Sequence, residues 1–130
     1  MDVIELPESS DQRGVSFSLL VDHLRAIGRV EDVHIATIGP GHVRGNHYHL
    51  ERGELIAVVY GGPWSLHWDT GPGTARRRRD FTGRGAVAVA PPVNWSHAVR
   101  NDGEVDLWIF VASDRPYDGS GDTVSRKVTD

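Results

Sequence analysis

The stretch GHVRGNHYHLERGELIAVVYG, residues 41–61, places two histidines just before a run of apolar residues. His47 and His49 are separated by one residue, so on an extended strand both side chains point to the same face. A turn across LERG at 50–53 would bring the carboxylate of Glu54 back beside the two imidazoles. The stretch therefore predicts two neighbouring strands that share a cluster of metal-ligating side chains.

Short apolar runs separated by turn-forming residues continue along the rest of the chain. The 130 residues include 15 glycines and 7 prolines. Short apolar runs separated by turns of this kind are typical of an all-β sandwich or barrel. The length suits one domain with a substantial core. We expect strands at Val15–Leu20, Val33–Ile38, Glu54–Tyr60, Trp64–Asp69, Ala86–Ala90, His97–Asn101 and Val105–Ala112.

Three segments fall outside this pattern of strands. The sequence LLVDHLRAIG at 19–28 predicts a short helical turn that ends at Gly28. The run RRRR at 76–79 predicts the exposed leg of a hairpin, with phosphate contact as the alternative because the arginine guanidinium suits phosphate. Residues 117–130 are polar, and we expect this tail to be partly mobile.

Charge and composition exclude several classes of partner and cofactor. The chain has 14 basic and 18 acidic residues, and its net charge of -4 argues against nucleic acid or an anionic membrane as the main partner. There is no cysteine, so any metal must be held by histidine and carboxylate side chains. The N-terminus lacks the pattern of a signal peptide, and no apolar stretch approaches the ~20 residues of a membrane span. A cytoplasmic location is therefore expected.

A third histidine completes the candidate metal site. His97 follows the turn PPVNWS at 91–96 and begins another expected strand. Three imidazoles and one carboxylate form a suitable ligand set for a divalent ion, with room left for water or substrate. The alternative is that the His-x-His pair is a surface or hydrogen-bonded pair, as isolated pairs of this kind often are.

Two motifs resemble those of the cupin family. The spacing Gly-x5-His-x-His-x4-Glu-x6-Gly over residues 41–61 resembles the first cupin motif at every position. The second motif is present as GAVAVAPPVNWSHAVRN at 85–101, with one extra residue before Pro92. Asn94 stands where glycine is usual, and asparagine tolerates the left-handed backbone better than most residues.

This resemblance implies a fold, a ligand set and a cofactor. The fold is a single cupin β-barrel, also called a double-stranded β-helix or jelly roll, over residues 1–130 with its core at about 11–115. One divalent metal ion is implied, and zinc, iron, manganese and nickel all remain open. Its ligands by this resemblance are His47, His49, Glu54 and His97.

A finer resemblance points to a class of substrate. The segments DQRG (11–14), RGNHYH (44–49) and VASDRPYD (111–118) are similar to cupins that act on nucleotide-linked keto-sugars. These are the dTDP-4-dehydrorhamnose 3,5-epimerase type, the dTDP-4-keto-6-deoxyglucose 3,4-ketoisomerase type and the C-terminal cupin of the capsular-polysaccharide reductase-epimerase. The resemblance implies an isomerase or epimerase with a small-molecule substrate. In the epimerase type the histidine matching His47 is a catalytic base, whereas we favour metal ligation here.

Enolisation of a keto-sugar needs a base, stabilisation of the enolate oxygen and an acid. The candidates for proton transfer are Tyr60, His67 and His34, which we expect at inward positions. The candidates for substrate binding are Arg44, Asn46, Trp68 and Trp95. The alternatives are hydrogen-bonded surface histidines and tryptophans that pack in the core.

Two other functions remain open. The same ligand set serves an iron dioxygenase, a decarboxylase or a cyclase in natural-product assembly, and a non-catalytic ligand-binding cupin is the third possibility. We also expect a homodimer, formed through the apolar strand at Leu107–Val111 that carries Trp108 and Phe110.

Overall fold

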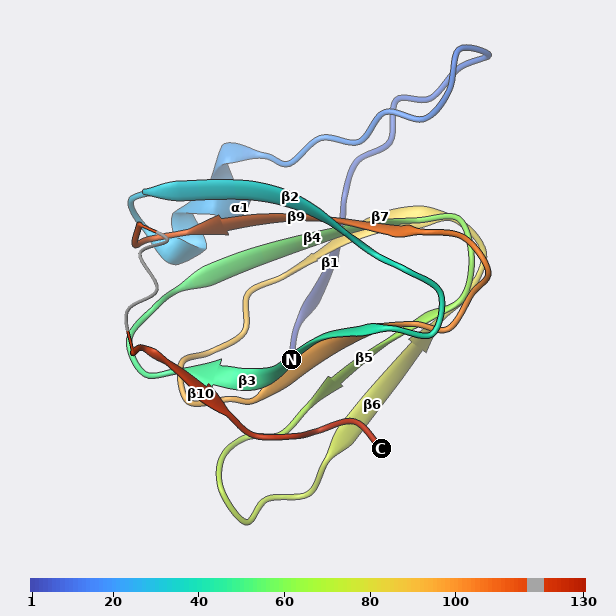
Figure 1. The fold of residues 1–130 in the computed structure, drawn as a ribbon. Coiled ribbons are helices and arrows are strands. Elements are labelled where there is room, and N and C mark those ends of the chain that lie inside the picture. The colour runs from blue at the N-terminus through green and yellow to red at the C-terminus, as the bar shows by residue number, and fades with distance from the viewer. Residues whose placement is uncertain (117–120) are drawn as a thin grey trace.

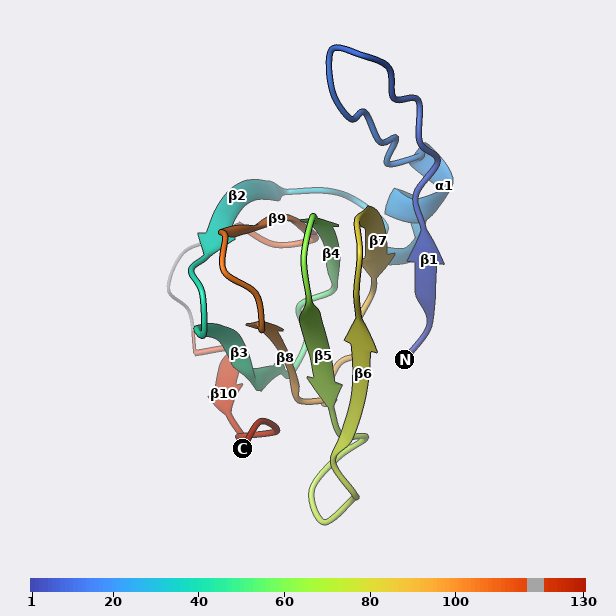
Figure 2. The same ribbon diagram turned by 90° about the vertical axis from the view of Figure 1, so that its right-hand side faces the viewer.

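The computed structural model describes residues 1–116 and 121–130, which fold into two five-stranded antiparallel sheets packed face to face (Figures 1 and 2). The first sheet has the order β1-β7-β4-β9-β2, and the second has the order β10-β3-β8-β5-β6. The strands are β1 (Val3–Glu5), β2 (Asp32–Ile38), β3 (Val43–His49), β4 (Glu54–Tyr60), β5 (Trp64–Trp68), β6 (Arg77–Phe81), β7 (Gly85–Val89), β8 (His97–Asn101), β9 (Leu107–Ser113) and β10 (Thr123–Ser125). The predicted all-β cupin jelly roll is confirmed.

The middle of strand β4, Leu55–Val58, is buried on both faces, which explains why this part of its sequence is apolar. Ile56 and Val58 pack in the core between the sheets, together with Trp64. Leu55 and Ala57 lie on the opposite face, in a second core beneath the N-terminal segment. The alternation expected from the sequence is therefore present, with apolar partners on each side.

Six of the seven expected strands are present, and the strand expected at Val15–Leu20 is not. Phe17 makes only an isolated bridge to Glu8, in a hairpin that projects from the sheets at the upper right of Figure 1. The polar residues at its tip leave too little apolar surface to build a strand into either sheet. The expected helical turn is confirmed as α1 (Val21–Leu24) followed by the 3-10 helix η1 (Arg25–Ile27).

The arginine run lies on an exposed edge strand. Arg77 is the first residue of β6, which pairs with β5 at the edge of the second sheet. The side chains of residues 76–79 are all exposed, and Arg78 forms an ion pair with Asp80 at 2.6 Å. The predicted hairpin leg is therefore confirmed. Neither of the short helices described is long and apolar enough to cross a membrane.

The C-terminal segment is a packed part of the molecule over its described residues, so the prediction of a mobile tail is wrong for 121–130. Strand β10 pairs with β3, and Val128 and Thr129 are each 2% exposed. Arg126 forms a partly buried ion pair with Asp69 at 2.7 Å. The sequence did not reveal these contacts because their partners lie far away along the chain. The rest of the predicted tail, 117–120, lies outside the described residues.

Candidate functional site

A cavity of about 600 Å³ lies between the two sheets. One part of its lining is apolar and comes from Val43, Ile56, Val99, Ile109 and Val111. The other part is polar and consists of His34, Arg44, His47, His49, Arg52, Glu54, His97 and Thr123. An apolar pocket with a few convergent polar groups is the usual form of a small-molecule site.

A bulge in β3 directs the first two histidines into this cavity. The register between β3 and β8 shifts between Gly45 and His47, where Asn46 adopts a φ of 59°. A Cβ on Gly45 would lie 2.5 Å from the carbonyl oxygen of His97, so glycine is the residue that permits this close approach. His47 is consequently paired with His97 across the two strands.

Four side chains converge at the polar end, and we call them the histidine–glutamate cluster: His47, His49, Glu54 and His97. One ligand atom from each lies within 4.8 Å of all the others. The two oxygens of the Glu54 carboxylate lie 3.1 Å from Nε2 of His49 and 3.5 Å from Nε2 of His97. Among the described residues neither of these buried nitrogens has a hydrogen-bond partner of good geometry. Buried imidazole nitrogens that converge on one point and have no hydrogen-bond partner are suited to bind a divalent ion.

The other ring nitrogens of His49 and His97 are held by the surrounding backbone and side chains. Nδ1 of His49 lies 3.3 Å from the hydroxyl of Thr123 and 3.4 Å from the carboxylate of Asp122. Nδ1 of His97 lies 3.2 Å from the carbonyl oxygen of Trp95. Such contacts orient an imidazole so that Nε2 faces the ligand. Sequence reasoning missed Thr123 and Asp122, because no motif spacing connects them to His49.

Burial and mutual repulsion set the protonation of the cluster. Burial, together with the positive charges that His97 and His49 can carry, lowers the pKa of His47 to about 4, although the charge of Glu54 acts in the opposite direction. Burial alone would raise the pKa of Glu54, but its contacts with His49 and His97 outweigh this and hold that pKa well below its usual range. At neutral pH His47 is neutral and Glu54 is ionised, the forms in which both side chains bind metal.

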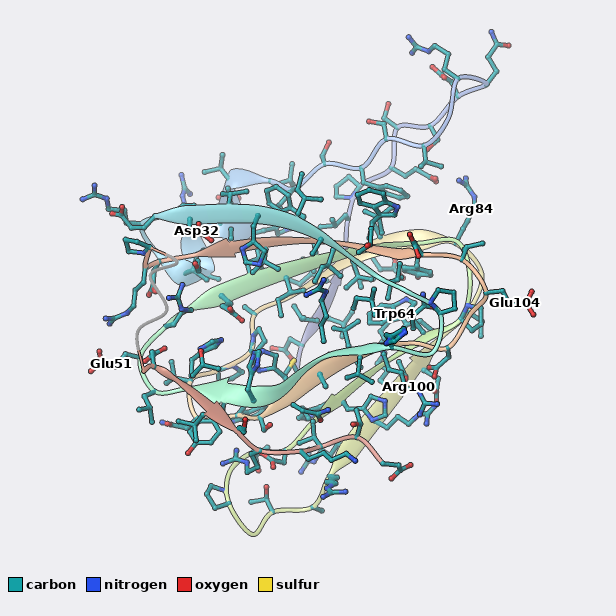
Figure 3. All side chains as sticks on the ribbon, in the orientation of Figure 1. Asp32, Glu51, Trp64, Arg84, Arg100 and Glu104 are labelled. Atoms are coloured by element: carbon teal, nitrogen blue, oxygen red, sulfur yellow. The ribbon has the colours of Figure 1, made fainter. Side chains whose placement is uncertain are left out.

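Two of the other predicted site residues also line the cavity. The Nδ1 atom of His34 lies 3.0 Å from the carboxylate of Asp32, which is labelled on β2 in Figure 3. Arg44 is exposed, and its Nε donates a hydrogen bond to the carbonyl of Thr37 at 2.9 Å. The structure therefore places an imidazole–carboxylate pair and a guanidinium along the same cavity as the cluster.

Tyr60 and His67 do not line the cavity, so the prediction that they lie near the cluster is wrong for both. The predicted inward position is correct for Tyr60, which packs against the core between the sheets, and wrong for His67. Tyr60 lies at the far end of β4, about 20 Å from Glu54 at ~3.3 Å per residue, and its ring packs against Trp64. His67 lies on the opposite face of β5 from the core residue Leu66, with a ring nitrogen 2.9 Å from the hydroxyl of Ser65. The alternation of β5 directs its apolar residues into the core between the sheets and His67 to the other face of the sheet, where His67 is nonetheless buried.

The remaining three predicted binding residues have structural contacts. Trp68 is 8% exposed and belongs to the core between the sheets, and Trp95 packs against the same core. The side-chain oxygen of Asn46 accepts hydrogen bonds from the backbone N–H groups of Val128 and Thr129. None of the three lines the cavity, and Asn46 instead fastens the C-terminal segment to the bulge of β3.

Solved structures with the same fold share little sequence identity with this chain. CapF, the capsular polysaccharide assembling protein from Staphylococcus aureus, has a TM-score of 0.67 and 21% identity over 95% of this chain. QdtA, a sugar 3,4-ketoisomerase from Thermoanaerobacterium thermosaccharolyticum, has a TM-score of 0.69 and 14% identity over 95% of this chain and 85% of QdtA. A dTDP sugar isomerase from Desulfovibrio desulfuricans has a TM-score of 0.75 and 14% identity over 98% of this chain and 83% of that protein. The chain spans 33% of the length of CapF.

A search of curated proteins finds no match to this sequence. The family model described as the polysaccharide biosynthesis C-terminal domain matches residues 9–124. That match covers both strands of the first motif, the whole of the second motif and every member of the histidine–glutamate cluster. The chain therefore belongs to the polysaccharide biosynthesis C-terminal domain family.

Proposed function

We propose that this protein binds one divalent metal ion in the histidine–glutamate cluster and isomerises or epimerises a nucleotide-linked keto-sugar. The observation that carries the proposal is the convergence of four ligand atoms within 4.8 Å of one another at the polar end of the cavity. A bound ion would act as a Lewis acid towards the carbonyl of a keto substrate. His47, His49, Glu54 and His97 would hold it.

The His34–Asp32 pair is our candidate for proton transfer. The Asp32 carboxylate lies 3.0 Å from Nδ1 of His34, and a carboxylate at that nitrogen favours the tautomer with a basic Nε2. Because His34 lines the same cavity as the cluster, we assign its imidazole the role of taking a proton from the carbon beside a substrate carbonyl. We keep His47 as a ligand, since ligation and proton abstraction by one imidazole exclude each other.

Support for a sugar nucleotide comes from the relatives and from the cavity. QdtA, a sugar 3,4-ketoisomerase, has been crystallised with TDP, and a variant of it with TDP-4-keto-6-deoxyglucose. Arg44, exposed on the lining of our cavity, has the guanidinium chemistry that binds a diphosphate. The apolar part of the lining suits a sugar with fewer hydroxyl groups.

The decisive experiment measures metal content and proton exchange on the same purified protein. We expect about one divalent ion per chain, and exchange of solvent deuterium into a dTDP- or UDP-linked 4-keto-sugar, followed by NMR. Glu54→Gln and His97→Ala should lose the metal and the exchange together. His34→Gln should keep the metal and slow the exchange by about 100-fold or more, as removal of a general base does.

His42→Ala is the matched control, because His42 is an exposed histidine outside the cavity. It should retain both metal and exchange. Full metal content in His47→Ala, Glu54→Gln and His97→Ala would refute the ligand assignment. If the protein instead contains iron, consumes oxygen when substrate is added and shows no deuterium exchange, the proposed isomerase function is wrong and the protein is an oxygenase.

A further inference from the structure

Arg52 is a buried arginine that neither motif includes. It lies in the turn between β3 and β4, is 8% exposed and lines the cavity. Its Nη1 donates hydrogen bonds to the hydroxyl of Ser113 at 3.1 Å and to the carbonyl of Arg115 at 3.0 Å. Its Nη2 donates to the carbonyl of Pro116 at 3.0 Å. All three acceptors are neutral, so none of them balances the charge of the guanidinium.

The carboxylates near this turn are engaged with other groups. Glu51, labelled at the left of Figure 3, pairs with Arg115 at 3.2 Å. Asp122 accepts hydrogen bonds from two backbone N–H groups of the turn and contacts an imidazole of the cluster. Glu54 faces the imidazoles of His49 and His97. In the part of the chain that the structure describes, no carboxylate forms an ion pair with Arg52.

The donors of Arg52 that remain have the chemistry to bind an anion. A buried charge is unfavourable unless an opposite charge accompanies it. A guanidinium has five N–H donors, and the three hydrogen bonds of Arg52 leave Nε–H and one N–H of Nη2. Nε and Nη2 share one edge of the planar group, which can bind two oxygens of the same anion.

We propose that Arg52 is a ligand-binding residue that holds a two-oxygen anionic group, a carboxylate or a phosphoryl group, inside the cavity beside the histidine–glutamate cluster. Arg44 is the other arginine of the cavity lining, but it is exposed and its Nε is already bonded to the carbonyl of Thr37. The cavity therefore has an outer and an inner cation. This inference concerns what the cavity binds, and it holds whichever reaction the protein catalyses.

Calorimetric titration of the full-length protein with two probes tests this role. The first probe is dTDP, which carries a diphosphate, and the second is glucuronate, a sugar that carries a carboxylate. The wild-type protein should bind at least one of them, with an affinity that falls as salt is added. Arg52→Gln should weaken that binding by about 10-fold to 100-fold, the usual effect of losing a charged hydrogen bond. The probe affinity of Arg52→Lys should lie between those of the wild type and Arg52→Gln, because lysine keeps the positive charge but lacks the two parallel N–H donors of the guanidinium.

Two further variants separate anion binding from packing. Ser113→Ala removes one hydrogen bond of Arg52 but leaves its charge, so it should lower the melting temperature and leave probe affinity unchanged. Added guanidinium should restore probe binding to Arg52→Ala. The proposal is wrong if the wild type binds neither probe, or if Arg52→Gln binds them as the wild type does. It is also wrong if Ser113→Ala loses as much affinity as Arg52→Gln.

Discussion

A single glycine determines how closely the two strands of the site approach each other. Gly45 has a φ of 113° and lies where β3 crosses the start of β8. The backbone can therefore bulge at Asn46, which adopts a left-handed conformation. After this bulge, the side chains of His47 and His49 both reach the cavity. The sequence predicted the two histidines on one face, but the bulge that places them could not be read from their spacing.

Gly45→Ala should destabilise the fold by about 2–4 kcal/mol, through a clash and a strained backbone together. The added Cβ would lie 2.5 Å from the His97 carbonyl oxygen and 2.7 Å from Cα of Ala98. Urea unfolding measures the loss. Gly61→Ala is the control, because a Cβ there meets nothing within 4 Å. Equal stability of the two variants would contradict the close-approach argument.

His47 should make the metal-free protein less stable in acid. Its pKa is lowered from 6.5 to about 4 in the folded protein, so between these values the unfolded chain binds the proton more readily. The stabilising contribution is therefore complete above pH 6.5 and is lost as the pH falls towards 4. After allowance for partial exposure we expect a loss of about 1 kcal/mol between pH 7 and pH 5.

Urea unfolding of metal-free protein at the two pH values, together with an NMR titration of the His47 ring, checks this expectation. His47→Gln should show a smaller dependence on pH over the same range. A His47 resonance that titrates near 6.5 would overturn it.

The longer apolar strands were predicted well from periodicity, and the three-residue strands at the two ends were not. The turn between β3 and β4 places Glu54 beside His49, as the spacing predicted. Strands β1 and β10 are short and pair with β7 and β3, which are distant along the chain. Three residues hold too little pattern for alternation to be recognised. For the same reason the contribution of β10 to the site could not be predicted.

Arg126 should be the main side-chain anchor of the C-terminal segment. It donates to both carboxylate oxygens of Asp69 and to the carbonyl of Asn94, and it lies 4.3 Å from the centre of the Tyr48 ring. Burial would raise the pKa of Asp69, but the hydrogen bonds from Arg126 and the backbone hold that pKa below its usual value.

Arg126→Met should therefore lower stability by about 3 kcal/mol, because it leaves the Asp69 carboxylate buried without its partner. Chemical denaturation measures this value. The double variant Asp69→Asn with Arg126→Met should recover part of the loss, since no unpaired charge then remains. A double variant less stable than Arg126→Met would argue against the ion pair as the source of the effect.

At the scale of the whole molecule, one sheet face carries apolar side chains that the chain itself leaves exposed. Trp108 is 54% exposed, and Val33 and Ile35 of β2 are 50% and 65% exposed. The register pairs Trp108 with Thr37 and Ile35 with Phe110, so these side chains share one face at the edge of the first sheet. An apolar face beside an edge strand is usually covered by a partner.

We expect a homodimer in which this face is covered by a second copy, and light scattering after size-exclusion chromatography measures the mass. Trp108→Asp and Ile35→Asp should each shift the protein towards the monomer. Val105→Asp is the control, because Val105 is 63% exposed but lies outside the paired strands β2 and β9. A wild-type protein that elutes as a monomer at high concentration would contradict this expectation.

The pairing of β10 with β3 also determines when the site can form during folding. The cluster needs side chains from β3, β4 and β8, and the contacts that orient His49 come from the last residues before and within β10. Strands so far apart in sequence associate slowly, because the intervening chain must be closed into loops first. A nascent chain on the ribosome would thus contain all four residues of the cluster before β10 is made and the contacts that orient His49 can form. If the cluster binds a metal as we propose, tight metal uptake would follow the pairing of β10 with β3, so a stopped-flow metal signal would time that step of folding.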